Sequence, residues 1–310
     1  MSRLKPDYFS KAGRQRPGAD VLRHLGSSLH RQWRRYRKRL KQCQQHFSEK
    51  AVHALRVEIR RLQATLDLLG VFMPERDIER ARRILQRHLE TFGPLRDTQV
   101  QLIYVKRLML TFPDAGEFCD WLRRREDRFT RETRKAVRHI KTKRLGRLLA
   151  AFEEEIRRQR RRTSGEQALA MVRRSMNQAF ARVAHLCRHV RAGDTRTIHR
   201  TRIAFKRFRY MIQALSPLLP VLTDEHRRAM RGYQCMMGDI QDMEVLLAAL
   251  DKFVQKKGVE VAAARRLKTE LVRWRQMLIQ VYLNAAGRLQ RFWPPPEPGP
   301  SGPKRKNKKT

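Results

Sequence analysis

The stretch VHALRVEIRRLQATLDLLGVFMP, residues 52–74, has a counterpart in IHRTRIAFKRFRYMIQALSPLLP, residues 198–220, at an offset of 146 residues. A second pair follows downstream, where FGPLRDTQVQLI at 92–103 aligns with MGDIQDMEVLLA at 237–248, at an offset of 145. A repeat of this length is too long for a solenoid unit and indicates a duplicated bundle of about four helices. The basic and histidine positions that coincide in the first pair are His53 with His199, Arg56 with Arg202, Arg60 with Lys206, and Arg61 with Arg207.

Apolar residues recur at helical spacing almost everywhere between sparse Gly and Pro residues, and alternating strand patterns are absent. We therefore expect an all-α protein built from two pseudo-symmetric, up-and-down four-helix bundles. The predicted units are an N-terminal extension (1–18), a first bundle (19–160), a second bundle (161–293) and a Pro/Gly-rich, basic tail (294–310) that is expected to be disordered. About eight long helices are predicted, at 19–46, 51–72, 75–110, 114–160, 166–192, 196–216, 224–256 and 259–292.

The charge of the chain is strongly unbalanced. Its 310 residues include 71 Lys and Arg against 30 Asp and Glu, which gives a formal net charge of +41. A compact body with that charge repels itself unless a negative partner lies against it. Arg predominates in the expected folded part, and its planar guanidinium can pair with two phosphate oxygens at once. These observations indicate a phosphate-rich partner, and they leave nucleic acid, polyphosphate and an anionic membrane surface open.

Cysteine usage and hydropathy favour a cytoplasmic protein. Residues 1–15 lack the apolar core of a secretory signal, and no apolar run approaches the ~20 residues that span a bilayer. His185 and His189 lie four residues apart without an evident third ligand, so we expect no metal and no cofactor. The cysteines lie apart, without a CxxC pair, which favours ordinary thiols over a zinc site or a disulfide framework: Cys43, Cys119, Cys187 and Cys235.

Each repeated helix is predicted to carry a basic stripe beside its apolar face. On the first helix the stripe is His53, Arg56 and Arg60, at i, i+3 and i+7. Like charges at such spacings destabilise a lone helix by a few tenths of a kcal/mol per pair. The same unfavourable stripe occurring twice indicates a use, the binding of several phosphates in a row. On the second helix the stripe is His199, Arg202, Lys206 and Arg209, with Tyr210 close to it.

These paired motifs resemble those of the CHAD domain family, the conserved-histidine α-helical domain. The residues that carry the resemblance are VHALRVEIRRLQ with FGPLRDTQV and IHRTRIAFKRFRY with MGDIQDMEV, and the match covers about 19–292. The resemblance implies a basic central surface between two bundles, binding of inorganic polyphosphate without a reaction, and association with polyphosphate granules and their proteins. The binding set that it implies, with Arg209 added from the stripe, is His53, Arg56, Arg60, Arg61, His199, Arg202, Lys206, Arg207, Arg209 and Tyr210.

The two halves also differ. Gln241 stands where the first half has Arg96, and Glu58 lies among the basic residues of the first motif, so equal contributions from the halves are not expected. Asp97 and Asp242 are expected to hold nearby basic side chains in place rather than to do chemistry. Secondary contacts to the polyanion are expected from Arg34, Arg35, Arg37, Arg83 and Arg228.

Two other functions stay open from the sequence. Nonspecific binding of RNA or DNA fits the charge and the tail KRKNKK, but aromatic residues are only 7% and are not interleaved with the basic stripes. A polyphosphate-processing enzyme would need a phosphate loop or paired acids that hold Mg²⁺, and neither accompanies the stripes, so we expect no enzyme. Because an unperturbed histidine titrates near pH 6.5, His53 and His199 are expected to strengthen binding at mildly acidic pH.

Overall fold

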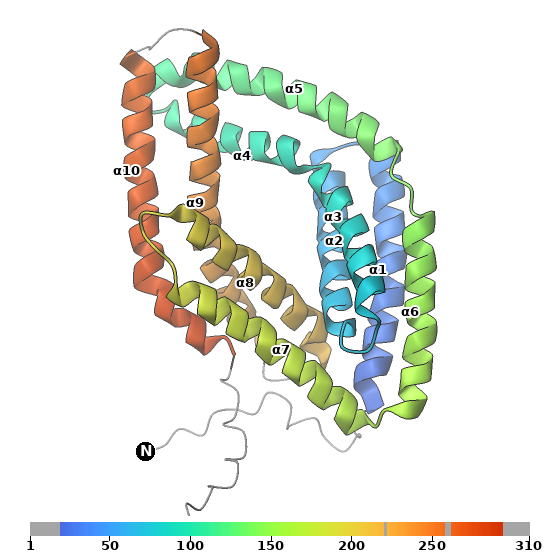
Figure 1. Ribbon diagram of the computed structural model, residues 1–310. Helices are drawn as coiled ribbons and strands as arrows, with labels where there is room; N and C mark the ends of the chain where they lie inside the picture. Colours follow the sequence, from blue (N-terminus) through green and yellow to red (C-terminus); the bar gives the residue numbers. More distant parts are fainter. Residues whose placement is uncertain (1–18, 220–221, 258–261, 294–310) are drawn as a thin grey trace, which may run out of the picture.

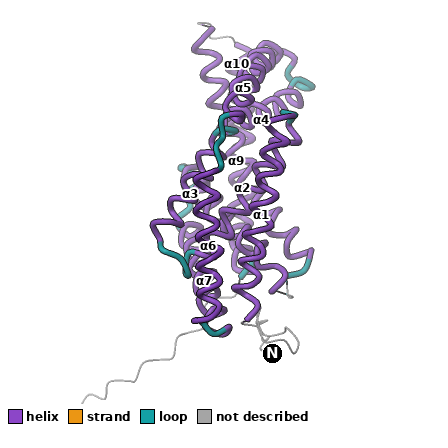
Figure 2. The backbone as a smooth tube through the Cα atoms, turned by 90° about the vertical axis from the view of Figure 1, so that its right-hand side faces the viewer, coloured by secondary structure: helices purple, strands orange, loops and turns teal. Residues whose placement is uncertain are grey.

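The computed structural model of the chain describes residues 19–219, 222–257 and 262–293. The predicted N-terminal extension and the predicted disordered tail lie outside these residues. Within them the chain is all-helical, as the sequence predicts, and Figure 2 shows the helices joined by short loops. The helices of the described residues are α1 (Ala19–Gln45), α2 (Glu49–Leu69), α3 (Glu75–Glu90), α4 (Gly93–Leu108), α5 (Gly116–Arg138), α6 (Lys143–Arg162), α7 (Gly165–Arg188), α8 (Thr195–Leu215), α9 (Asp224–Lys257) and α10 (Ala262–Ala285), with short 3-10 helices η1 (Pro113–Ala115), η2 (Ser216–Leu218) and η3 (Ala286–Arg291).

Two of the predicted helices are each divided in the structure. The segment 75–110 is broken between α3 and α4, where Pro94 lies in the first turn of α4. Proline has no N–H to donate and its ring clashes with the preceding turn, so an undisturbed helix through this position is strongly disfavoured. The segment 114–160 is broken between α5 and α6, and there Gln44 Nε2 of α1 donates to the Val137 carbonyl at 3.1 Å, beside the hydrogen bond that this carbonyl accepts from Ile140 N.

The helix bounds follow the sequence repeat. A shift of 146 residues places Glu49–Leu69 of α2 on Thr195–Leu215 of α8. The caps coincide as well, because Ser48 accepts a hydrogen bond from Ala51 N at the start of α2 and Asp194 accepts one from Arg196 N at the start of α8. The helix α9 runs unbroken through the region that corresponds to α3 and α4, since Asp239 occupies the place of Pro94.

The buried apolar residues form two separate hydrophobic cores, and each core contains residues of both repeats. The larger core packs residues of α1, α2, α3, α6, α7 and α8 with the first half of α9 and the end of α10, so that Leu62 and Phe205 belong to the same cluster. The second core lies between α4, α5, α9 and α10, and joins Val105 to Leu246. The helix α9 contributes to both cores, with Tyr233 in the larger and Leu246 in the second. The repeats therefore share their cores, and the division at 160/161 stays a sequence prediction.

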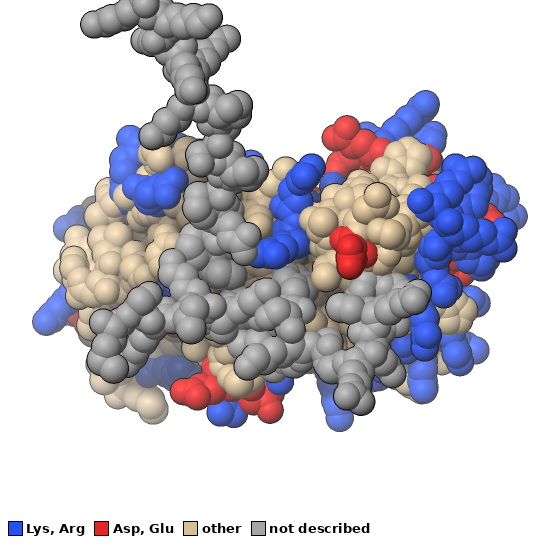
Figure 3. All heavy atoms as spheres, turned by 90° about the horizontal axis from the view of Figure 1, so that it is seen from below, with Lys and Arg blue, Asp and Glu red and all other residues tan. Residues whose placement is uncertain are grey.

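Basic side chains are spread unevenly over the surface. Figure 3 shows Lys and Arg gathered densely on the side where α6 lies in Figure 1, with acidic side chains scattered among them. The last turn of α6 carries Arg160, Arg161 and Arg162. Among the described helices, none has the length and apolar character needed to cross a membrane.

Candidate anion-binding site

The two basic stripes come together because α2 packs against α8. In Figure 1 these helices converge toward their C-terminal ends, where Arg207 of α8 is paired with Asp67 of α2. Each stripe borders the apolar face of its helix, so packing of the two faces turns the stripes toward each other. Lys206 accordingly lies within electrostatic reach of both Arg56 and Arg60. We call the following residues the central cluster: Arg56, Arg60, Arg202, Lys206, Arg209 and Tyr210.

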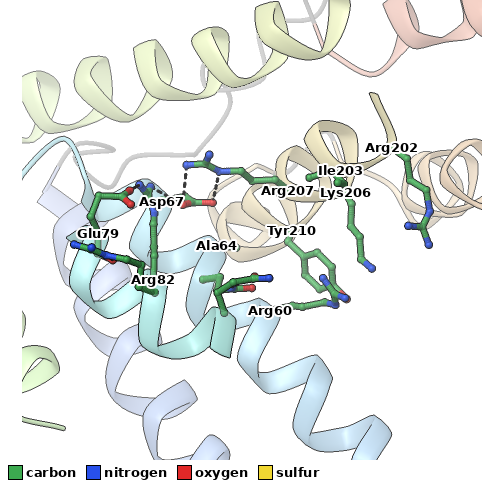
Figure 4. Close-up of a pocket in the computed structure, with 13 residues that line it drawn as sticks. Arg60, Ala64, Asp67, Glu79, Arg82, Arg202, Ile203, Lys206, Arg207 and Tyr210 are labelled. Carbon is green, nitrogen blue, oxygen red and sulfur yellow. Dashed lines mark hydrogen bonds and ion pairs between the residues drawn. The ribbon is translucent and has the colours of Figure 1, made fainter. Parts of the chain in front are cut away.

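A cavity of about 410 Å³ lies beside the central cluster, between α2, α3 and α8 (Figure 4). Arg60, Lys206 and Tyr210 line it from the two repeats, and Figure 4 shows the Arg60 side chain directed at the Tyr210 ring. Cations outnumber acids on its walls. The charged residues that line it are Arg60, Arg82, Arg83, Arg202, Lys206 and Arg207, with Asp67 and Glu79.

Burial and like charge both act against the charged forms of the central cluster. Burial, reinforced by repulsion from Arg60 and Arg202, lowers the pKa of Lys206 to about 6. Burial and repulsion from Arg60 also lower the pKa of Arg56, to about 10. The pKa values of Arg60 and Arg209 are lowered mainly by burial. A group of partly desolvated cations with such shifts is stabilised when an anion enters it.

Lys206→Met is expected to stabilise the protein in the absence of ligand. The pKa of Lys206 falls from the usual 10.5 to about 6 on folding, so the folded state disfavours its charged form. The resulting loss of folding stability is greatest below about pH 6. It decreases as the pH rises toward 10.5, by up to ~1 kcal/mol per pH unit. Chemical denaturation of both proteins between about pH 6 and pH 9 should show the variant more stable, by a margin that narrows with rising pH. A margin that does not change with pH would contradict this account of Lys206.

Arg202 is flanked by aspartates from α4 and α9. Electrostatic contacts join it to Asp97, Asp239 and Asp242. Burial raises the pKa of Asp242, and Arg202 acts in the opposite direction. The Nε of Arg202 is buried without a hydrogen-bond partner among the described residues, and a Cβ on Gly238 would lie 3.7 Å from it. The carboxylates therefore surround Arg202 on the α4–α9 side, while its other side faces the cavity.

Arg209 is ordered by direct contacts at the opposite side of the cluster. Its Nε donates to Gln234 Oε1 of α9 at 2.8 Å. Its guanidinium lies over the Tyr210 ring, 4.7 Å from the ring centroid. A cation held over an aromatic face in this way needs little reorganisation to receive an anion.

Arg61 and Arg207, both predicted binding residues, are engaged in ion pairs. Arg61 Nη1 donates to Glu58 Oε1 at 2.7 Å on the same helix. Arg207 forms a two-point pair with Asp67, at 2.6 and 2.9 Å, and Asp67 also receives Arg82 at 2.6 Å. Arg61 and Arg207 thus differ from the cations of the central cluster, none of which forms an ion pair with a carboxylate among the described residues. The Asp67–Arg207 pair also lies between the central cavity and a second cavity of about 420 Å³, since both residues line both cavities.

The CHAD domain model matches residues 27–251 of the chain. The chain belongs to the CHAD domain family. Its fold is similar to that of the CHAD domain from the plant Ricinus communis, with a TM-score of 0.62, 18% identity, and coverage of 86% of this chain and 91% of that one. PptA from Streptomyces chartreusis matches with the same TM-score, 15% identity, and coverage of 87% and 99%. No curated protein matches the chain.

The two histidines of the CHAD motifs occupy different environments in this chain. His53 lies near the N-terminal end of α2 and is exposed. His199 is half-buried beside Arg202, and burial followed by repulsion from Arg202 lowers its pKa. Its Nδ1 is buried without a hydrogen-bond partner in the described part of the chain. Of the pair, His199 therefore belongs to the surroundings of the central cluster.

The predicted secondary residues are distributed over three places. Arg83 lines the central cavity from α3, and its Nε donates to the Glu79 carbonyl at 3.4 Å. Arg228 is exposed on α9 and interacts electrostatically with Asp224. The three arginines of α1 are exposed and away from the central cavity, and two of them line a separate groove: Arg34, Arg35 and Arg37.

The sequence assigned no role to three residues beside the central cluster and its cavity. Asp67 pairs with two arginines, Arg82 completes that network from α3, and Arg96 of α4 reaches the central cluster beside Arg56. A signal for Asp67 was present, because it is an acid within the apolar run LDLL at the end of α2. A charge in such a place is normally paired. No signal in the sequence indicated which cation would pair with it.

Proposed function

We propose that this protein binds inorganic polyphosphate, and that α2 and α8 form one binding site from the two repeats. The observation that carries the proposal is the setting of Lys206. Burial lowers the pKa of the Lys206 ammonium group. The charged neighbours that lower it further are four guanidinium groups, two from each repeat: Arg60, Arg202, Arg56 and Arg209. Such a set of cations is unfavourable alone and favourable around a chain of phosphates.

The walls of the cavity favour a bare phosphate chain over nucleic acid. Tyr210 is the aromatic residue that lines the cavity, and Arg209 covers its ring. Single-stranded nucleic acid is normally held by bases stacked on exposed rings, in addition to its phosphates. Polyphosphate has no bases, and it needs only aligned guanidinium and ammonium groups. The resemblance to the CHAD family supports the same ligand.

A competition experiment tests the proposal. Fluorescent long-chain polyphosphate is bound at near-physiological salt and displaced by unlabelled polyphosphate, RNA and duplex DNA at equal phosphate concentration. We expect polyphosphate to compete more than about tenfold better than either nucleic acid, and its affinity to fall steeply with salt because bound counterions are released. Equal competition by RNA or DNA would instead identify a general polyanion binder driven by net charge.

The proposal includes binding without turnover and association with polyphosphate granules in the cytoplasm. Incubation with polyphosphate, Mg²⁺ and a nucleotide should leave the polymer length unchanged on a gel. Shortening or extension of the polymer would require an enzymatic role. A fluorescent fusion that stays diffuse in cells with stained granules would contradict the granule association.

Acidification is expected to strengthen binding. Bound phosphates favour the ammonium form of Lys206, whose pKa is about 6 without ligand, so binding near pH 7 takes up as much as about one proton per site. Titration calorimetry in two buffers of different ionisation enthalpy measures this uptake, and affinities at about pH 8 and pH 6 measure its consequence. Lys206→Met should abolish most of the uptake, whereas His53→Gln should retain it. Flat affinity together with no proton uptake in the parent protein would contradict the assignment.

A further inference from the structure

A second cationic groove lies on α1, apart from the central cavity. It has a volume of about 680 Å³ and lies between the second half of α1 and the link from α5 to α6. Its lining shares no residue with the central cavity. We call it the α1 groove, and its cationic lining is Arg34, Arg37, Lys38 and Lys41, with Ile140 and Thr142 on the facing wall.

Both walls of the α1 groove come from segments that contain no acidic residue. Residues 21–48 hold eight Lys and Arg, residues 133–152 hold seven, and neither stretch has an Asp or Glu. The four cations of the α1 wall are exposed, and within the described residues none of them forms an ion pair. This distinguishes the groove from the end of α6, where Arg157 and Arg158 pair with acids on their own helix.

The facing wall contains the N-terminal end of α6, which favours the binding of an anion. Thr142 lines the groove directly before α6, and its side chain makes no capping hydrogen bond. The first N–H groups of a helix have no partner within the helix, and its N-terminus carries partial positive charge. The exposed cations Lys141, Lys143 and Arg144 flank the same point. The groove thus joins aligned side-chain cations to a positive helix end.

The indole ring of Trp33, on the same helix as the groove cations, is half-buried and does not line the groove. Trp33 stacks on Tyr36 with ring centroids 5.5 Å apart, and Arg37 lies 5.9 Å from its centroid. On another side, a Cβ placed on Gly146 would lie 3.1 Å from the Trp33 ring. Because its lining contains no aromatic residue, the groove offers charge without a stacking platform, which suits a phosphate chain better than RNA.

We propose that the α1 groove is a second binding site for the polyphosphate chain, so that a polymer long enough to reach both sites binds more tightly than a short one. This inference rests on the proposed function of the central cluster. Once one part of a chain is bound, its remainder is present at high effective concentration near the second site, and the affinity for long polymers rises without any new contact at the first.

The test compares polymer lengths across matched charge variants. The groove variant is Arg34→Ala/Arg37→Ala/Lys38→Ala/Lys41→Ala, and its facing-wall counterpart is Lys141→Ala/Lys143→Ala/Arg144→Ala. The control removes four exposed cations at the α4–α5–α9–α10 end of the molecule: Arg124→Ala, Lys252→Ala, Lys256→Ala and Arg273→Ala. Affinities for tripolyphosphate and for long-chain polyphosphate are measured over a range of salt, and circular dichroism melting establishes that each variant folds.

We expect the groove variant to bind long-chain polyphosphate at least about tenfold more weakly than the control variant, with tripolyphosphate affinity changed less than about threefold. The slope of the logarithm of its affinity for the long polymer against the logarithm of the salt concentration should become less steep by about 3, since four phosphate contacts are lost. The facing-wall variant should change in the same direction.

Equal losses in groove and control variants would overturn the inference in favour of bulk charge, and a loss confined to RNA would make the groove a nucleic-acid site. If the parent protein does not prefer polyphosphate over RNA, the proposed function itself fails.

Discussion

Changing Arg60 and Arg202 together to alanine is expected to lower the affinity for long-chain polyphosphate by about a hundredfold or more. One arginine comes from each repeat, and both line the central cavity. Hydrogen bonds to charged groups contribute about 1.5–3 kcal/mol each, so the loss of two removes at least ~3 kcal/mol of binding free energy. Fluorescence anisotropy with labelled polyphosphate measures the loss directly.

The matched control is Arg61→Ala/Arg196→Ala. It removes the same charge from the same two helices, but Arg61 pairs with Glu58 and Arg196 pairs with Asp194, each at 2.7 Å. We expect a loss below about fivefold, because these guanidinium groups are already engaged and screened by solvent. If the control loses as much as the central double variant, affinity follows net charge and the central cluster is not the site.

Asp67→Ala is expected to destabilise the protein by about 2–4 kcal/mol. The Asp67 side chain is only 5% exposed and pairs with Arg82 of α3 and Arg207 of α8, so its loss leaves two guanidinium groups without their carboxylate. Removal of one partner from a buried ion pair is strongly destabilising, and the effect is reduced here because Arg207 is 52% exposed. Urea denaturation measures the change in the free energy of unfolding.

Polyphosphate should partly restore the stability of Asp67→Ala. The two freed arginines line the central cavity and would then accept phosphates, so saturating polymer should raise the melting temperature of the variant more than that of the parent. The control is Asp77→Ala, which breaks the solvent-exposed pair with Arg80 and should cost below about 1 kcal/mol. A variant at Asp67 that is as stable as this control would show that the Asp67 network does not tie the repeats together.

The sequence was sufficient for features that depend on local pattern and on repetition. The aligned motifs predicted the equivalence of α2 and α8, and the Ser48 and Asp194 caps of the structure lie at equivalent positions. Helical spacing predicted which side of each helix is buried, and therefore where the basic stripes lie. The break before α4 could also have been recognised, because proline is disfavoured in the middle of a helix and favoured in its first turn, where Pro94 lies.

The local sequence pattern could not predict which side chains meet across different helices. Arg60 and Arg61 are adjacent in the sequence, yet Arg61 meets Glu58 while Arg60 faces the cations of the other repeat. His53 and His199 match in the alignment, but His199 is half-buried beside Arg202 and Gln241 of α9, whereas His53 is exposed. The role of Lys206 arises from burial between two helices, which its place in a basic stripe does not indicate.

The most direct test of the central claim is a crystal structure of the protein with a short polyphosphate of defined length. We expect one chain in the cavity between α2, α3 and α8, with phosphate oxygens within hydrogen-bond distance of Arg60, Arg202 and Lys206, so that both repeats hold the same chain. Phosphates bound to α2 and α8 separately, or found only on the outer surface, would contradict a single site shared by the repeats.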